Sequence, residues 1–250
     1  MIKLFRIIRQ QLLQEGKSLE YLKYAIGEIV LVVIGILIAL QINNWNESQK
    51  DNAKIKIALR ALHNDIVKDS IFIADKLPYY IEVYEQNKIL IEKAYASSTN
   101  LDTLIRIMKE DFNIFWGGNL PNNRTTFDNV KSNGTFELLS DSIKSALSEL
   151  YTLQDEAIRD IKEVNIQYRT HLDEFLKTYN LTGRIINDNY RNSYIYNNSW
   201  QNINKDHFTP RVAVMLGSYG VLYNTTQRCL TTLQNKIRVL LPPLNSSKDQ

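Results

Sequence analysis

Hydrophobic residues follow two different patterns along this chain. Near the start, residues 29–40 form an unbroken apolar run, and Glu28 just before it is the one ionisable residue in residues 25–40. Beyond about residue 50, apolar residues recur at every third or fourth position among polar ones. A continuous run predicts a segment surrounded by apolar material, whereas the spaced pattern predicts helices with one buried face.

The apolar run predicts a transmembrane helix within residues 21–45. Residues 24–43 supply the ~20 residues needed to cross a hydrocarbon core of ~30 Å. Tyr21, Tyr24 and Trp45 flank the run as an interfacial aromatic belt would. A cleaved signal peptide is the alternative, but no small-x-small cleavage site follows Leu40 and the preceding segment is long. We therefore expect an uncleaved signal anchor.

Residues 1–20 precede this helix as a basic amphipathic segment. The stretch MIKLFRIIRQQLL places apolar residues on one face, with Lys3, Arg6 and Arg9 at its polar edge. Such a helix either lies among the headgroups and binds anionic lipid or only orients insertion. A slight excess of basic residues before the run predicts a cytoplasmic N-terminus and a body, residues 46–250, outside the cytoplasm.

The body reads as helical, and the expected fold class is all-α. An N-terminal amphipathic helix and one transmembrane helix are followed by an antiparallel helical bundle. Helices are predicted near 46–75, 78–96, 101–111, 140–177 and 209–241. Pro78 is expected to separate the first two, and Pro242-Pro243 to end the last. No strong helix breaker lies between residues 40 and 65, so the first helix is able to continue from the membrane span.

Glu28 is the chemically unusual residue of the span. A bare carboxylate inside the membrane costs a few kcal/mol, about 2.5–3.5 at the centre of a helix. Glu28, Gly35 and Ala39 share one helical stripe, and Gly35-x-x-x-Ala39 is a small-x-x-x-small contact. The stripe predicts self-association or a partner helix. The alternatives are a side chain that snorkels to the interface, and a ring of carboxyls that conducts ions or protons.

Two irregular stretches, residues 113–123 and 180–206, combine Trp or Tyr with several Asn residues. Aromatic rings stack on sugars and amides bind their hydroxyls, so these loops predict a possible glycan site. The other reading is that the aromatic residues cap the open end of the bundle. The candidate ligand residues are Trp116, Tyr194, Tyr196 and Trp200.

Composition narrows the remaining function classes. Nine glycines and five prolines in 250 residues favour long helices. The net charge of +3 is spread along the chain, which argues against a nucleic-acid partner, and the single cysteine, Cys229, excludes an internal disulfide framework. His63, His171 and His207 form no metal motif, and acidic pairs such as Asp173-Glu174 read as solvated helix faces. We expect no catalytic residues, no metal, no cofactor and no enzyme activity.

Two stretches carry a family resemblance. The run YAIGEIVLVVIGILIALQINNWNE, behind its basic start, and the later RTTFDNVKSNGTFELLSDSIKSAL resemble an uncharacterised family of small single-span membrane proteins of Bacteroidota. The resemblance implies a protein of the bacterial inner membrane. It supplies no activity and no site residues.

Three functions remain open. The first is a non-enzymatic single-span membrane protein whose extracytoplasmic helical bundle scaffolds or binds a partner, with self-association or partner contact through the transmembrane helix. The second is a ligand- or glycan-sensing ectodomain that signals through a membrane partner. The third is an oligomeric pore or proton-coupled component that uses Glu28. Membrane lipid is an expected partner in each of them.

Overall fold

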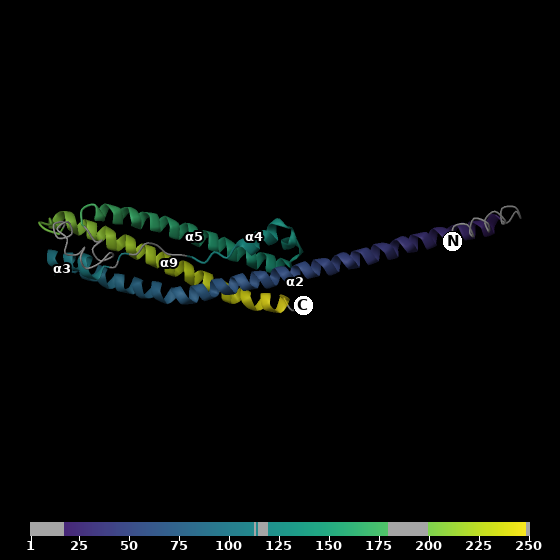
Figure 1. Ribbon diagram of the computed structural model, residues 1–250, viewed down its shortest axis with the longest axis horizontal. Helices are drawn as coiled ribbons and strands as arrows, with labels where there is room; N and C mark the ends of the chain where they lie inside the picture. The colour runs from purple at the N-terminus through teal and green to yellow at the C-terminus, as the bar shows by residue number, and fades with distance from the viewer. Residues whose placement is uncertain (1–17, 113, 115–119, 180–199, 249–250) are drawn as a thin grey trace, which may run out of the picture. The chain divides into compact units, whose positions relative to one another are not determined.

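The structure, a computed structural model, describes residues 18–112, 114, 120–179 and 200–248 (Figure 1). These residues are helical or lie in loops, and no strand occurs among them. The predicted all-α fold class is therefore confirmed. The chain divides into two compact units, residues 1–55 and 56–250, and each is described by itself below.

The first unit is described from residue 18, where helix α2 (Ser18–Tyr95) begins. The predicted amphipathic segment lies almost wholly outside the described residues. From Ile26 to Ile42, every large apolar side chain of α2 is between 47% and 63% exposed. Within the described residues, this is the one helix long and apolar enough to cross a membrane, and its apolar part lies near the N-terminus.

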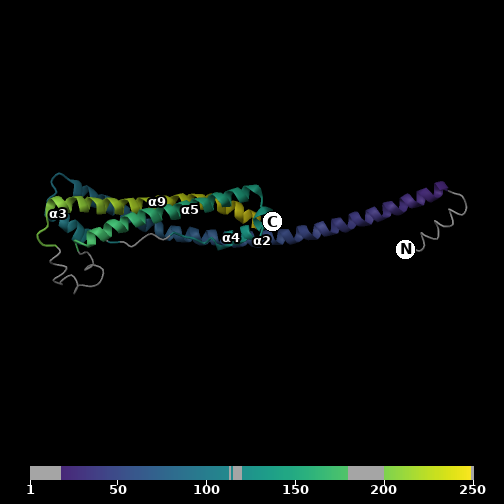
Figure 2. The same cartoon turned by 90° about the horizontal axis from the view of Figure 1, so that it is seen from above.

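Three long helices form the second unit: the remainder of α2, α5 (Asp141–Leu176) and α9 (Lys205–Lys248). They lie side by side in both views (Figures 1 and 2). Tyr80 and Asn87 of α2 contact Tyr223 and Leu216 of α9, so these two helices run in opposite directions.

Helix α5 also runs opposite to α9. Tyr168 and Phe175 of α5 contact Tyr219 and Phe208 of α9, so residue numbers rise along one helix as they fall along the other. Because α9 is antiparallel to both of its neighbours, α2 and α5 are parallel to each other. A parallel pair requires a connection that returns along the length of the bundle.

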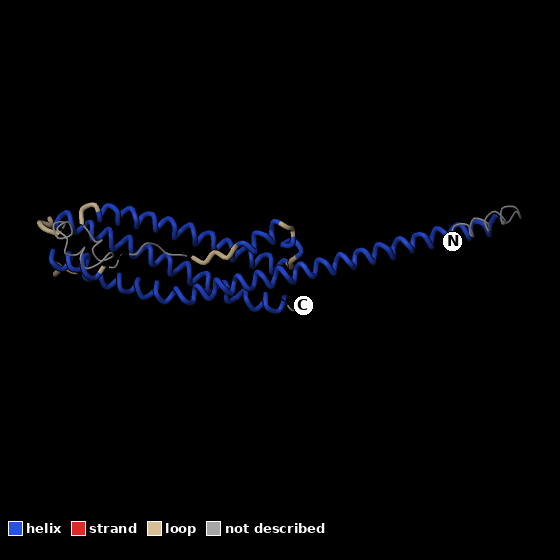
Figure 3. Tube along the Cα trace, in the orientation of Figure 1, coloured by secondary structure: helices blue, strands red, loops and turns tan. Residues whose placement is uncertain are grey.

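Short helices and loops supply that connection. Helix α3 (Leu101–Arg106) and the π-helix η1 (Ile107–Asp111) follow α2, and together they confirm the predicted helix over 101–111. Residues 120–124 are loop, and they lead to α4 (Thr125–Ser132) and the 3₁₀ helix η2 (Thr135–Leu138) before α5 (Figure 3). Helix α4 was not predicted as a separate element.

The predicted seams form the core of the bundle. Most of their members are at most 4% exposed in α2, α5 and α9 alike, whereas Ile55 and Val164, also expected in the seams, are only partly buried. The members at or below 4% exposure include Leu59, Leu62, Ile66, Ile73, Ala157, Ile161, Tyr168, Leu172, Phe175, Met215, Tyr219, Leu222, Leu230, Leu233, Ile237 and Leu240. At roughly 1.5–3 kcal/mol for each large apolar side chain removed from water, this burial is the main term that holds the three helices together.

The predicted proline breaks are wrong. Pro78 lies inside α2, and Pro242 and Pro243 lie inside α9, which continues to Lys248. A proline inside a helix leaves the carbonyl four residues earlier without its donor, and here those residues, Ala74, Arg238 and Val239, are exposed. Water is able to bind these carbonyls, while buried neighbours such as Tyr80 and Leu244 keep the helix packed.

Candidate functional site

The predicted stripe of the span lies in the first unit. A Cβ atom added at Gly35 would meet no atom within 4 Å, and Ala39 is exposed. Glu28, seven residues before Gly35 on the same stripe, is partly buried. The structure describes a single chain, so helix pairing through Gly35 and Ala39, and a role for Glu28, stay predictions.

Trp200 lies in an aromatic cluster where α5 ends and α9 begins. Its ring centroid is 5.8 Å from that of Tyr179 and 6.2 Å from that of Phe208, and its side chain is 9% exposed. The Phe175 and Tyr179 rings lie alongside, with their centroids 5.0 Å apart. Little of the Trp200 ring is therefore accessible to a ligand. Trp116, Tyr194 and Tyr196 lie outside the described residues.

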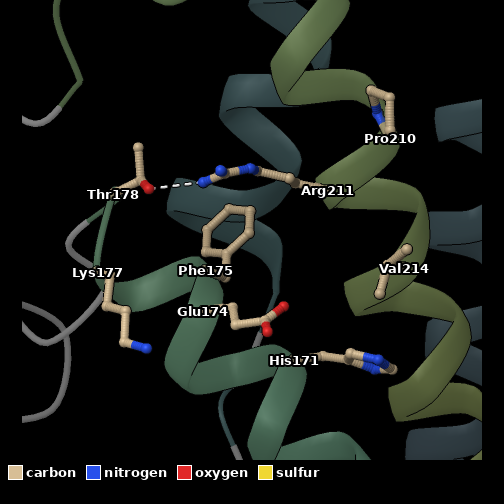
Figure 4. A pocket seen from close by; sticks show the side chains of 8 residues that line it. All are labelled: His171, Glu174, Phe175, Lys177, Thr178, Pro210, Arg211 and Val214. Carbon is tan, nitrogen blue, oxygen red and sulfur yellow. Dashed lines mark hydrogen bonds between the residues drawn. The ribbon is translucent and has the colours of Figure 1, made fainter.

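A pocket of about 350 Å³ opens next to this cluster, between the last turns of α5 and the first turns of α9 (Figure 4). This volume lies within the range of small-molecule sites, ~300–1,000 Å³. The α5 side is lined by His171, Glu174, Phe175, Lys177 and Thr178, and the α9 side by Pro210, Arg211 and Val214.

Opposite charges face this pocket from its two sides. The Arg211 guanidinium reaches from α9 toward α5, where its Nη1 donates to Thr178 Oγ1 at 2.6 Å (Figure 4). The Glu174 carboxylate extends from α5 into the same space. Phe175, at 2% exposure, forms an apolar wall between them. Glu174 is exposed, as its reading as part of a solvated helix face predicted, and so is Arg211. Sequence reasoning missed the pair because Arg211 is distant from Glu174 in the chain.

The pocket continues along the surface groove between α5 and α9. A second hollow of about 320 Å³ shares His171 and Val214 with the first, and Val164 and Val221 line its farther part. His171 thus stands where the two hollows meet, and its Nδ1 is buried without a hydrogen-bond partner among the described residues. The groove therefore offers apolar surface beside the charged pair.

A second polar cluster lies at the other end of the bundle, buried between α2 and α5. Asp69 is 5% exposed, and it accepts hydrogen bonds from Asn123 Nδ2 at 2.5 Å and from Gln154 Nε2 at 3.2 Å. Gln154 Nε2 also donates to the carbonyl oxygen of Pro121 at 2.8 Å. Burial raises the pKa of Asp69, and the two amide donors only partly offset this effect. The cluster fastens the loop before α4 to both long helices.

Residues 124–147, the second stretch that carries the family resemblance, also hold α4 and the loop before it to the long helices. Arg124 pairs with Asp155 of α5 and, at 3.0 Å, with Asp128, while Thr126 Oγ1 donates to Asp65 Oδ2 at 2.5 Å. The Phe127 ring stacks on Tyr151 with centroids 4.0 Å apart. These contacts fix α4 against α5 and α2, so the visible role of this segment is structural.

Other reactive groups are scattered. Burial raises the pKa of the Cys229 thiol, which makes the nucleophilic thiolate less available at neutral pH. Within residues 18–112, 114, 120–179 and 200–248, no group of three or more His, Cys, Asp or Glu side chains is placed to hold one metal ion. The expectation of a chain without metal or catalytic residues stays a prediction.

Comparison with known proteins identifies a family. No curated protein and no solved structure shows significant similarity to the sequence. The model of a family of unknown function, DUF6090, matches residues 28–169. The match begins at Glu28 and ends within α5, so it contains the apolar run, the Asp69 cluster and α4. Because it covers more than half of the sequence, the chain belongs to the DUF6090 family, as the resemblance to an uncharacterised family predicted.

Proposed function

We propose that this protein is a non-enzymatic, membrane-anchored binding protein. Residues 21–45 cross the inner membrane of a bacterium once, with the N-terminus in the cytoplasm. The helical bundle of residues 56–248 binds or scaffolds a partner on the outer side. Self-association through the stripe of Glu28, Gly35 and Ala39 accompanies this role.

The observation that supports the anchor is the contrast in burial between the two units. The apolar side chains from Ile26 to Ile42 are about half exposed, whereas the seams of the bundle are almost wholly buried. Leaving a Val, Leu or Ile side chain in water rather than burying it costs roughly 1.5–3 kcal/mol. A dozen such side chains in one continuous surface require a cover, and a lipid bilayer supplies it on all sides of a helix.

A fractionation experiment tests the anchor. The full chain, produced in a bacterium, should remain in the membrane pellet after extraction with alkaline carbonate. Ile34→Lys combined with Leu37→Lys should release it, because each lysine near the middle of a span costs about 2.5–3.5 kcal/mol. Ile57→Lys combined with Ile71→Lys is the matched control, since these two isoleucines are 71% and 64% exposed on the bundle. Extraction of the unmodified chain would exclude the anchor.

Cysteine labelling tests the orientation. In a Cys229→Ser background, Lys3→Cys and Asp141→Cys place single thiols before the span and on the bundle, where the Asp141 side chain is 99% exposed. A membrane-impermeant maleimide added to intact spheroplasts should label the thiol at position 141 and spare the one at position 3. The reverse pattern would put the bundle in the cytoplasm.

A second candidate function is ligand sensing by the bundle. The pocket between α5 and α9, with its opposed charges and apolar wall, favours this candidate. As a sensor, the bundle would signal through a membrane partner. Glycan binding by the two irregular stretches remains a prediction.

A further inference from the structure

We infer that the pocket between α5 and α9 binds a small zwitterion with an apolar side chain, of the class of free α-amino acids. This inference rests on the ligand-binding candidate function and not on the membrane anchor. Binding and fractionation are separate measurements, so either proposal is able to fail without the other.

The charge arrangement is the first argument. Arg211 and Glu174 face one pocket from different helices, and no ion pair joins them within the described part of the chain (Figure 4). Each charge is thus open to a counter-charge supplied from outside. The guanidinium matches a carboxylate, and the Glu174 carboxylate matches an ammonium group. A molecule that carries both groups satisfies both sides of the pocket at once.

The Arg211 side chain is held in place for this role. Thr178 accepts one of the five N–H donors of its guanidinium, and the Tyr179 ring lies 6.0 Å from the guanidinium carbon. These contacts orient the guanidinium toward α5, and Arg211 lines the pocket. A preorganised arginine loses less side-chain entropy when it binds a carboxylate.

The place of Glu174 also suits an ammonium group. It lies in the last turns of α5, which ends at Leu176. Carbonyl groups at the C-terminus of a helix carry partial negative charge, which adds to that of the carboxylate and favours a bound cation. Lys177 also lines the α5 side, so the negative part of this half is confined to Glu174 and the end of the helix, while Arg211 supplies the positive charge of the α9 side.

The remaining walls select an apolar side chain. Phe175 is buried behind the charged pair, and Pro210 and Val214 line the α9 side. Beyond Val214, the groove extends along α5 and α9 toward Val221. A branched aliphatic or aromatic side chain gains by leaving water here.

Titration calorimetry with the full chain in lipid nanodiscs, near neutral pH, tests the inference. L-Leucine and L-phenylalanine are the probes. For at least one of them we expect saturable binding with one site per chain. For L-leucine, two analogues isolate the two charges: 4-methylpentanoate lacks the ammonium group, and 3-methylbutylamine lacks the carboxylate. Each should bind at least about tenfold more weakly than L-leucine, because each leaves one charged side chain unpaired.

Substitutions assign the charges to residues. Arg211→Gln and Glu174→Gln should each weaken amino-acid binding by about tenfold or more. Glu174→Gln should not weaken binding of 4-methylpentanoate, because that analogue has no ammonium group to lose. Asp173→Asn, next to Glu174 in the chain, and Arg228→Gln, farther along α9, are exposed residues outside the pocket lining; these matched controls should bind as the unmodified chain does.

Three results would overturn the inference. The first is no saturable binding of either amino acid up to about 10 mM. The second is equal affinity for L-leucine and its analogues, and the third is an equal loss in the control variants. Helix content measured by circular dichroism must match that of the unmodified chain, so that lost binding is not lost folding. A chain that stays in the membrane but binds no amino acid would support the anchor and refute the inference about the ligand.

Discussion

Asn87 of α2 donates its Nδ2 hydrogen to the carbonyl oxygen of Leu216 in α9, at 3.1 Å. A Cβ atom at Gly220, one turn further along α9, would lie 2.8 Å from the same nitrogen. Asn87 is 1% exposed, so its amide has no room to move into solvent. Glycine at position 220 thus lets the two helices approach closely enough for this bond, which favours one register of α9 on α2.

Replacing Gly220 with alanine should lower the free energy of unfolding by about 1–3 kcal/mol, because the added methyl group displaces a buried, bonded amide. Urea denaturation of the full chain in mild detergent, followed by circular dichroism, measures the change. Combining Gly220→Ala with Asn87→Ala should cost less than the sum of the two single changes, since the clash disappears.

Gly217→Ala is the matched control on the same helix. A Cβ atom at Gly217 would meet nothing within 4 Å, and the residue is exposed. Alanine there should raise stability by up to about 1 kcal/mol through its higher helix propensity. Equal effects at positions 217 and 220 would contradict the role given to the Asn87 contact.

Asp69 should make stability depend on pH. Burial raises its pKa above the ordinary value of 3.8, so the folded protein holds this proton more tightly than the unfolded chain. The stabilisation is fully present below about pH 3.8 and is lost as pH rises through the folded pKa. Denaturation of the full chain and of Asp69→Asn, repeated from pH 4 to 7, gives the free energy of unfolding of each. The excess of the unmodified chain over Asp69→Asn should shrink as pH rises.

Asp75→Asn is the control for that series. Asp75 lies on the same helix, and its side chain is 67% exposed. The stability curve of this variant should run parallel to that of the unmodified chain. The assignment would be refuted if the difference in free energy of unfolding between the unmodified chain and Asp75→Asn shrank as pH rises. It would also be refuted if that difference stayed constant for Asp69→Asn.

Trp200 should matter for stability. Its ring packs on Tyr179 and Phe208, so Trp200→Ala should lower the free energy of unfolding by about 3–5 kcal/mol, whereas Trp200→Phe should cost less. Thermal unfolding of the full chain measures both. A glycan-binding role would instead predict an alanine variant of normal stability that has lost a ligand.

Disulfide crosslinking in membranes tests self-association through the span. In the Cys229→Ser background, cysteine at Gly35 or Ala39 should form dimers under mild oxidation, because small residues allow two helices to approach closely. Cysteine at Val33, on the opposite side of the helix, is the control and should stay monomeric. Equal crosslinking at all three positions would indicate random collision.

The sequence pattern predicted the buried faces better than the ends of the helices. Helix α5 begins at Asp141 as expected, although Ser140 makes no side-chain capping bond. The seams of α2, α5 and α9 are buried as the 3.6-residue period requires. The proline predictions were wrong because the free-energy cost of a proline inside a helix depends on whether the carbonyl groups that lose their donors reach water. Local sequence does not reveal this.

The pocket lay beyond the reach of sequence patterns for a different reason. Glu174 and Arg211 come together only because α5 and α9 pair in one register and direction. The parallel course of α2 and α5 depends likewise on the loop around residues 120–124, which no hydrophobic period marks. Helical periodicity states which face is buried, but not which neighbour covers it.

The family match stops at residue 169, before α9 begins, yet α9 is the helix that both α2 and α5 run against. A chain cut at the end of the match would leave Tyr80, Asn87 and Tyr168 without the surface that now encloses them. The matched portion thus holds two of the three long helices, and the helix that completes the enclosure of their facing side chains lies beyond it.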